Sequence, residues 1–170
     1  NLFEVQILKV YKIYQNKIKD LNACDFGDLI LYCVKIFEKH EDIRNIYSNN
    51  FKYILVDEYQ DTNFIQNKWL NLIVNKNKNI CCVGDDDQSI YSWRGAEIKN
   101  FLTFDKIYKN CKVFKLEQNY RSTKNILMTA SNLISNNSNR VDKKLWSSAN
   151  QGELVKLNCY RSGKEEAQGI

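Results

Sequence analysis

The sequence predicts an α/β fold in which helices flank a parallel β-sheet. Two short apolar runs typical of strands, 53–56 and 80–83, are separated by a segment with helical periodicity. A strand, a helix and a second strand within about thirty residues have the size of a βαβ unit, which makes its two strands parallel. A polar, charged cluster directly follows each strand, and this predicts a ligand site at one edge of the sheet.

The composition is that of a globular protein. The 170 residues are 44% hydrophobic and 26% charged, enough for one domain or for one domain and part of another. No stretch approaches the ~20 apolar residues of a membrane span, and no secretory signal is evident. We therefore expect a soluble cytoplasmic protein with no membrane partner. The net charge of +5 is compatible with nucleic-acid binding but does not establish it.

The sequence has one histidine, His40, and six cysteines without a CxxC pair, at positions 24, 33, 81, 82, 111 and 159. Neighbouring Cys81 and Cys82 in a strand would point to opposite faces, so they are poorly placed to bind one metal. We expect buried, reduced thiols and a solvated His40. Because the chain begins with Asn1 and ends inside a predicted helix, we interpret it as a piece of a longer protein.

Three helices are predicted before the first strand. Residues 3–21 have apolar side chains every three or four positions and lysines on the opposite face. Those lysines suit a phosphate backbone, although a solvated helix face is the simpler interpretation. Asp25 is the expected N-cap of a helix through Phe37, and a short helix is expected at 42–47. The continuous apolar run 53–56 predicts a strand buried on both faces.

Later elements follow from the same patterns. Ser122 or Thr123 is the expected N-cap of the last long helix. The remaining predicted elements are helices over 62–74, 98–104 and 123–134, a short helix that begins at 164, and strands over 80–83, 112–116 and 154–159.

Asp57 and Glu58 directly follow the first strand. A carboxylate at a strand end can hold Mg²⁺ through water, because this ion prefers oxygen ligands and keeps much of its hydration. The next carboxylate can accept a proton from a water that attacks a phosphate, as in nucleoside triphosphatases. A solvated acidic turn is the alternative interpretation of this pair.

The second strand runs into Gly84, three aspartates at 85–87 and Gln88. A glutamine amide both donates and accepts hydrogen bonds, which suits it to orient water or to sense a terminal phosphate. Because parallel strands end at the same edge of a sheet, we expect this loop to lie beside the acidic pair of the first strand. Three negative charges beside a phosphate site require a cation or a basic partner.

Tyr91, Trp93 and Arg94 place two aromatic rings beside a guanidinium group. Single-stranded nucleic acid is commonly bound by aromatic stacking, worth about 1–3 kcal/mol per base, with arginine assisting. Two core aromatics beside a surface arginine are the alternative.

Tyr120 and Arg121 follow the third predicted strand. An arginine at such a place can stabilise the charge that develops on a transferred phosphoryl group, and a ring beside it can stack on a purine base. An ordinary interdomain salt bridge is the alternative for the arginine.

Three long motifs resemble the UvrD/PcrA/Rep family of superfamily I DNA helicases. They stand in family order and at family spacing, over 54–63, 83–96 and 116–123. Residues 24–30 are similar to the family's Asp-Phe-Asp-Asp-Leu segment, with Gly27 where an aspartate is usual. Weaker similarities lie at 144–146 and 165–167, so the resemblance covers the chain from about Asp25 to its end.

The resemblance implies an ATP site. Asp57 and Glu58 would be the Walker B pair that binds Mg²⁺, with Glu58 as the general base. Gln88 would contact the γ-phosphate and couple the state of ATP to the grip on DNA. Tyr120 would stack on adenine, and Arg121 would be an arginine finger from a second motor domain.

The resemblance also implies a DNA site and a fold. Tyr91 and Trp93 would stack under single-stranded DNA, with Arg94 in the same coupling region. The fold would be a RecA-like parallel sheet flanked by helices, of the P-loop NTPase type. Residues 1–22 would end an inserted helical subdomain, 23–110 would form the later half of the first motor domain, and 111–170 would begin the second.

The expected function is that of an ATP-dependent 3′–5′ DNA helicase that moves on single-stranded DNA and acts at junctions of single and double strands. The phosphate loop Gly-x-Gly-Lys-Thr is absent from these residues, so we expect it upstream and expect these 170 residues alone to hydrolyse essentially no ATP. A helicase-nuclease subunit similar to RecB or AddA ranks second, because those proteins usually differ in the Asp-Asp-Asp-Gln and Tyr-Ser-Trp stretches. A nucleic-acid-binding module without hydrolysis is the third possibility.

Overall fold

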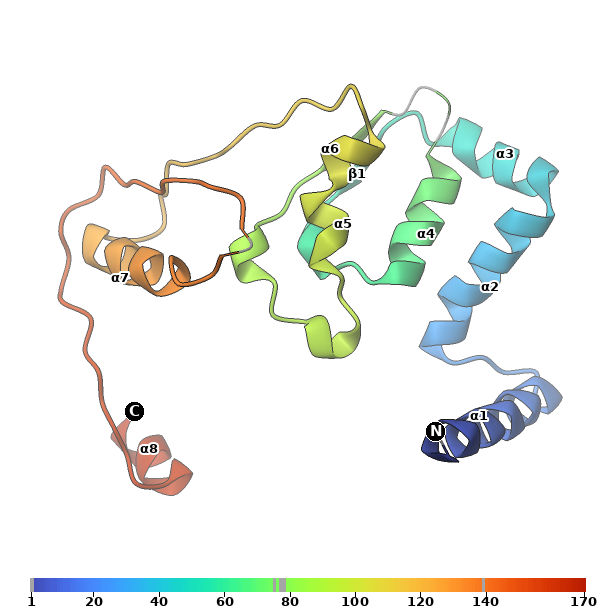
Figure 1. The fold of residues 1–170 in the computed structure, drawn as a ribbon, viewed down its shortest axis with the longest axis horizontal. Coiled ribbons are helices and arrows are strands. Elements are labelled where there is room, and N and C mark those ends of the chain that lie inside the picture. Colours follow the sequence, from blue (N-terminus) through green and yellow to red (C-terminus); the bar gives the residue numbers. More distant parts are fainter. Residues whose placement is uncertain (1, 75, 77–78, 139) are drawn as a thin grey trace. The chain divides into compact units, whose positions relative to one another are not determined.

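The computed structural model describes residues 2–74, 76, 79–138 and 140–170. Figure 1 shows the elements, which belong to two compact units, Asn1–Thr103 and Phe104–Ile170. None of the helices in the described residues combines the length and the apolar character of a membrane span.

Three helices open the first unit, as the sequence predicts. They are α1 (Leu2–Asp20), α2 (Phe26–Lys39) and α3 (Glu41–Asn50). The predicted N-cap of α2 is confirmed, because the Asp25 carboxylate accepts the Asp28 N–H at 2.8 Å and the Asp28 carboxylate accepts the Asp25 N–H at 3.2 Å. This reciprocal pair is a capping box, which satisfies backbone donors that the first turn of a helix leaves unpaired.

The predicted βαβ unit is confirmed. Strand β1 (Ile54–Val56) pairs in parallel with β2 (Ile80–Cys82), and α4 (Phe64–Ile73) lies between them in the chain. A second capping box, between Asn63 and Gln66, begins α4. Because β1 and β2 are parallel, the segments that follow them leave the sheet at the same edge.

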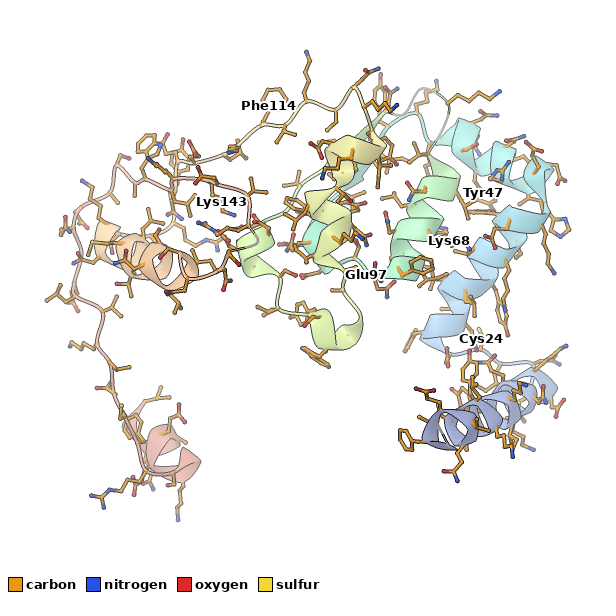
Figure 2. The ribbon with its side chains drawn as sticks, viewed as in Figure 1. Cys24, Tyr47, Lys68, Glu97, Phe114 and Lys143 are labelled. Atoms are coloured by element: carbon orange, nitrogen blue, oxygen red, sulfur yellow. The ribbon has the colours of Figure 1, made fainter. Side chains whose placement is uncertain are left out.

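The core of this unit lies where α2, α3 and α4 pack together (Figure 1). Lys68 on α4 also forms an ion pair with Glu38 on α2, with 2.6 Å between Nζ and Oε1, and Tyr47 on α3 lies against Phe37, with 5.4 Å between ring centroids (Figure 2). Among the described residues of the unit, the buried apolar side chains are Val34, Phe37, Tyr59, Leu70 and Ile73.

The expectation that the first strand is buried on both faces is wrong. Leu55 is 80% exposed, and Cys81, its partner in register, is exposed on the same face of the pair. The flanking residues Ile54 and Val56 are half-buried. Side chains alternate between faces along a strand, and nothing in the described part of the chain covers the face that carries Leu55.

Further helices partly match the predicted ones. Where the sequence predicts one helix over 98–104, the structure has α5 (Ile98–Leu102) at the end of the first unit and α6 (Phe104–Ile107) at the start of the second. The second unit also contains α7 (Lys124–Ile134) and α8 (Gly163–Gly169). Thr123 is the N-cap of α7, as expected, although its side chain makes no capping hydrogen bond.

The strands predicted over 112–116 and 154–159 are absent from the structure, where both segments have no regular secondary structure. Their apolar side chains are exposed, and Figure 2 labels Phe114, which is 80% exposed, on the first segment. A strand needs the backbone of a neighbouring strand for its hydrogen bonds. Apolar composition alone therefore does not produce one.

The expectation of buried cysteines is also wrong. All six are free thiols, but Cys82 and Cys111 are half-buried and the other four are exposed. Cys24, Cys111 and Cys159 lie outside the helices and strands, where little of the chain packs against them. His40 is exposed between α2 and α3, as expected.

Candidate nucleotide and DNA site

The acidic pair lies at the carboxyl end of β1. The Asp57 Oδ1 atom accepts the N–H of Glu58 at 2.9 Å, and both side chains are exposed. Glu58 has a left-handed backbone with a φ of 48°, which is uncommon for a residue with a side chain. Such conformations cost free energy and cluster at functional sites. The chain then turns into the short 3₁₀ helix Tyr59–Asp61.

The polar loop after β2 lies beside this acidic pair. The parallel ladder continues past both strands, because the Val83 N–H donates to the Val56 carbonyl at 2.8 Å and the Tyr59 N–H donates to the Val83 carbonyl at 3.0 Å. The expectation that the two strand ends come together is thereby confirmed.

Gln60 joins the two loops directly. Its side chain is buried, with 1% exposed, and its Nε2 donates to Glu58 Oε2 at 2.7 Å. Its Oε1 accepts the N–H of Asp85 at 3.1 Å. The sequence alone does not indicate a role for Gln60, because the group that it reaches is 25 residues away and no local pattern points to the contact.

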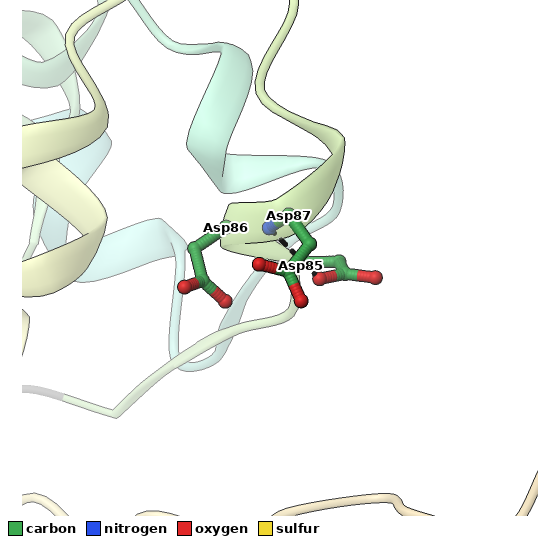
Figure 3. Close-up of side chains that lie close together, drawn as sticks. All are labelled: Asp85, Asp86 and Asp87. Carbon is green, nitrogen blue, oxygen red and sulfur yellow. Dashed lines mark hydrogen bonds between the residues drawn. The ribbon is translucent and has the colours of Figure 1, made fainter. Parts of the chain in front are cut away.

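Asp85 organises the loop after β2. It caps the 3₁₀ helix Asp86–Gln88, with its Oδ1 accepting the Asp87 N–H at 3.1 Å and its Oδ2 accepting the Gln88 Nε2–H at 2.7 Å. One carboxylate oxygen from each of Asp85, Asp86 and Asp87 lies within 4.8 Å of the other two (Figure 3). The exposed amide of Gln88 is therefore held at a defined place on this edge of the sheet.

Tyr91, Trp93 and Arg94 form one aromatic and cationic cluster. The ring centroids of Tyr91 and Trp93 lie 6.3 Å apart, and the Arg94 guanidinium carbon lies 5.2 Å and 4.6 Å from them. Trp93 is 73% exposed and Tyr91 is 36% exposed. The alternative that these rings belong to the core is therefore wrong.

The segment that carries this cluster is tied to the acidic loop. After the 3₁₀ helix Ser92–Arg94, the left-handed Gly95 turns the chain so that Ala96 bridges to Asn63 in antiparallel fashion. The Glu97 N–H then donates to the Thr62 carbonyl at 3.0 Å. The aromatic cluster is thus connected by backbone hydrogen bonds to the segment that follows the acidic pair.

Tyr120 and Arg121 lie in the second unit and are both exposed. The Asn119 side chain accepts the N–H groups of Arg121 and Ser122 at 3.0 and 2.8 Å, and the Tyr120 hydroxyl donates to Gln118 Oε1 at 2.7 Å. These bonds give the loop before α7 a fixed backbone conformation.

This loop is also held by the segment around Trp146. The Trp146 N–H donates to the Glu117 carbonyl at 2.9 Å, and the Asn119 N–H donates to the Trp146 carbonyl at 2.7 Å. The Glu117 side chain accepts the Lys144 N–H at 2.8 Å. Residues 144–146, where the sequence shows only a weak similarity to the family, thus form the backbone partner of the 116–123 motif.

The chain is thus an α/β protein with carboxylates and amides at the ends of adjacent parallel strands, the edge at which open parallel sheets bind ligands. The exposed carboxylates of Asp57 and Glu58 are oxygen ligands of the kind that Mg²⁺ prefers, so this end of β1 fits that ion.

Comparison with known families agrees with this arrangement. A sequence model of the UvrD/REP helicase N-terminal domain matches residues 1–109, and one of the UvrD-like helicase C-terminal domain matches residues 114–170. The chain belongs to the UvrD/REP helicase family.

Relatives are similar over nearly the whole chain. It is 51% identical over 161 residues to the probable DNA helicase II homolog of Rickettsia conorii. The aligned region is 95% of this chain and 25% of that protein. It is 44% identical over 167 residues to the ATP-dependent DNA helicase PcrA of Bacillus subtilis. Here the aligned region is 98% of this chain and 22% of that protein. The chain spans about a quarter of the length of these relatives.

Proposed function

We propose that this chain is part of an ATP-dependent DNA helicase that couples ATP hydrolysis to 3′–5′ movement along single-stranded DNA in the cytoplasm. One observation carries the proposal. In a chain of the helicase family, the loop that bears Asp57 and Glu58 is hydrogen-bonded to the loop that bears Gln88. The proposed domains are a helical subdomain end over 1–22 and parts of two RecA-like motor domains over 23–110 and 111–170.

In the proposed ATP site, Asp57 would hold Mg²⁺, which would supply positive charge against the phosphates. Glu58 accepts a proton from the attacking water. Gln88 contacts the terminal phosphate through an amide that can both donate and accept. The left-handed backbone of Glu58 and the Asp85 bond to Gln88 support these roles, because both fix the direction of a side chain at this edge.

In the proposed DNA site, bases stack on Trp93 and Tyr91 while Arg94 adds positive charge. The exposure of both rings supports this role. The backbone bonds from this segment to residues Thr62 and Asn63 give a physical route from the ATP site to the DNA site. Junctions of single and double strands are the proposed substrate.

In the proposed second motor domain, Tyr120 stacks on the adenine ring and Arg121 stabilises negative charge on the transferred phosphoryl group. The hydrogen bonds of the Asn119 side chain to this loop support the assignment, because a preorganised arginine loses less conformational freedom when it binds a phosphate.

The test uses the full-length protein that contains this chain. We expect ATP hydrolysis that single-stranded DNA stimulates, and unwinding of a duplex with a 3′ single-stranded tail but not of one with a 5′ tail. Glu58→Gln should keep ATP binding and lower turnover by at least about 100-fold, as the loss of a general base does.

Two results would contradict the proposal. DNA binding without any ATP hydrolysis by the full-length protein would favour a binding module. Retained turnover in Glu58→Gln would reject Glu58 as the base. Arg44→Gln, which removes an ion pair between the half-buried Arg44 and the exposed Glu41 on α3, is the control that should hydrolyse ATP at the wild-type rate.

A further inference from the structure

Gln60 occupies the place where the two loops of the site meet. Its Nε2 donates to Glu58 Oε2 at 2.7 Å, and its Oε1 accepts the Asp85 N–H at 3.1 Å. With 1% of its surface exposed, it is among the most deeply buried side chains of the described residues. The Gln60 side chain thus bridges Glu58 and Asp85, and both of these residues belong to loops that bear proposed site residues.

An amide is the side-chain group that this position requires. One end must donate to a carboxylate and the other must accept a backbone N–H, and glutamine offers both within one planar group. A glutamate of the same shape has no donor when it is ionised, and it would place a second negative charge against Glu58. An apolar side chain of the same length would remove the Gln60 acceptor from the half-buried Asp85 N–H, which is costly.

Gly84, in the segment that follows β2, packs closely against the Gln60 amide. A Cβ atom added to Gly84 would contact Gln60 Oε1 and would lie 2.9 Å from the Phe101 ring. The amide therefore has little freedom to leave its place, since it is limited by Gly84 on one side and held by two hydrogen bonds.

We infer that Gln60 is a positioning residue, which aims the Glu58 carboxylate and couples it mechanically to the loop that carries Gln88. This inference rests on the proposed function. The bond from Gln60 engages Glu58 Oε2, and the Oε1 atom remains to accept a proton from water. The bond to the Asp85 N–H means that a shift of the loop after β2 also shifts the Glu58 carboxylate.

The coupling has a definite path. The Asp85 carboxylate accepts the Gln88 Nε2–H at 2.7 Å and the Asp85 backbone N–H donates to Gln60, so Gln88, Asp85, Gln60 and Glu58 form a chain of hydrogen-bonded residues. A proposed sensor of the terminal phosphate stands at one end of that chain, and the proposed general base stands at the other. Hydrogen-bonded chains of this kind can carry energetic coupling between two groups.

Two variants of the full-length protein distinguish the bond from Gln60 to Glu58 from the bond between Gln60 and the Asp85 N–H. Gln60→Glu keeps an acceptor for the Asp85 N–H and removes the donor to Glu58, whereas Gln60→Met removes both. We expect each to lower kcat for ATP by about 10- to 100-fold, because a misplacement of about 1 Å can cost that much, while KM for ATP stays within about threefold.

Amide hydrogen exchange at Asp85 is the second measurement, and it does not depend on hydrolysis. The Asp85 amide should exchange at least about tenfold faster in Gln60→Met than in the wild type, and within about threefold of the wild-type rate in Gln60→Glu. Gln66→Met is the matched control. It removes a 2.9 Å hydrogen bond of the α4 capping box and touches neither Glu58 nor Asp85, so kcat should stay within about twofold of wild type.

Each outcome bears on the inference. A wild-type kcat in Gln60→Glu, or an unchanged Asp85 exchange rate in Gln60→Met, would overturn it. An equal loss of kcat in Gln66→Met would show that Gln60 acts only through stability. If the wild-type protein hydrolyses no ATP, the proposed function fails, and the exchange rates then decide alone whether Gln60 couples the two loops.

Discussion

The guanidinium carbon of Arg94 lies 4.6 Å from the centroid of the exposed Trp93 ring. Arg94 and Tyr91 are the neighbours that orient this ring, and its exposed surface leaves it in reach of a flat ligand. Trp93→Ala in the full-length protein should therefore weaken binding of a single-stranded oligonucleotide by about 5- to 150-fold, which corresponds to about 1–3 kcal/mol per stacked base. Fluorescence anisotropy at one fixed salt concentration measures the affinity.

The control is Phe26→Ala, which removes a ring that is 93% exposed on α2 and lies outside the cluster. Its affinity for DNA should equal that of the wild type. Equal losses in the two variants would mean that Trp93 contributes only apolar surface, and no loss in Trp93→Ala would exclude stacking on this ring.

Gly84→Ala should destabilise the first unit. The added Cβ would lie 2.9 Å from Phe101 Cε2 and would contact the Gln60 amide, both in a closed space. Overpacking of this kind costs about 1–3 kcal/mol, and urea unfolding followed by circular dichroism measures it.

Gly163→Ala is the matched control for that substitution. A Cβ there meets nothing within 4 Å, at the start of α8. We expect no loss of stability, because alanine favours a helix by about 1 kcal/mol over glycine. An unchanged unfolding midpoint in Gly84→Ala would show that Phe101 and Gln60 move aside at no cost.

Local patterns were sufficient to predict the elements that form their own contacts. Asp25 directly precedes the apolar stripe of α2 and reaches a backbone N–H only three residues away, so this N-cap was predictable from the sequence alone. The parallel arrangement of β1 and β2 was predictable for a similar reason, since a strand, a helix and a strand within about thirty residues are typical of a βαβ unit, whose strands are parallel. The same rule brought the acidic pair and the loop after β2 together.

Contacts between distant residues were not predictable. Gln60 reaches an N–H that is 25 positions away, and nothing in its neighbourhood indicates this partner. The segment 112–116 has the apolar composition of a strand but finds no partner strand among the described residues, so Phe114 and Leu116 remain exposed. The exposure of Leu55 has the same origin, because burial depends on what packs against a face and not on the strand itself.

Asn125→Ala should destabilise the second unit by about 2–4 kcal/mol. The buried Asn125 amide donates to the carbonyls of Gly152 and Glu153 at 3.0 and 3.2 Å, and it accepts from Gln151 Nε2 at 2.8 Å. These bonds tie α7 to a segment far along the chain. Faster amide exchange within α7 would report the loss.

Asn132→Ala is the control for that variant, because it changes an exposed asparagine of the same helix. Its exchange rates should match those of the wild type. If Asn125→Ala exchanges no faster than this control, the three hydrogen bonds do not hold α7 in place.

Acid should remove the contribution of Asp25 to stability. The N–H of Asp28 and then the Tyr14 hydroxyl donate to the Asp25 carboxylate, and these bonds lower its pKa from the ordinary value. A group whose pKa is lowered in the folded state stabilises the protein above its unfolded pKa of about 3.9, and this stabilisation disappears as the pH falls through the folded pKa. Asp25→Ala should therefore unfold at less urea than the wild type at pH 7, and the difference should shrink steadily below about pH 4.

Asp20→Ala, at the exposed end of α1, is the control for this pH dependence. It leaves the capping box intact, so its urea midpoint should follow that of the wild type at every pH. A difference between Asp25→Ala and the wild type that stays constant from pH 7 to pH 2 would show that the side chain acts through its shape or its contacts as a neutral group. A difference that closes only at low pH would show that the charged carboxylate, bonded to the Asp28 N–H and to Tyr14, holds the start of α2.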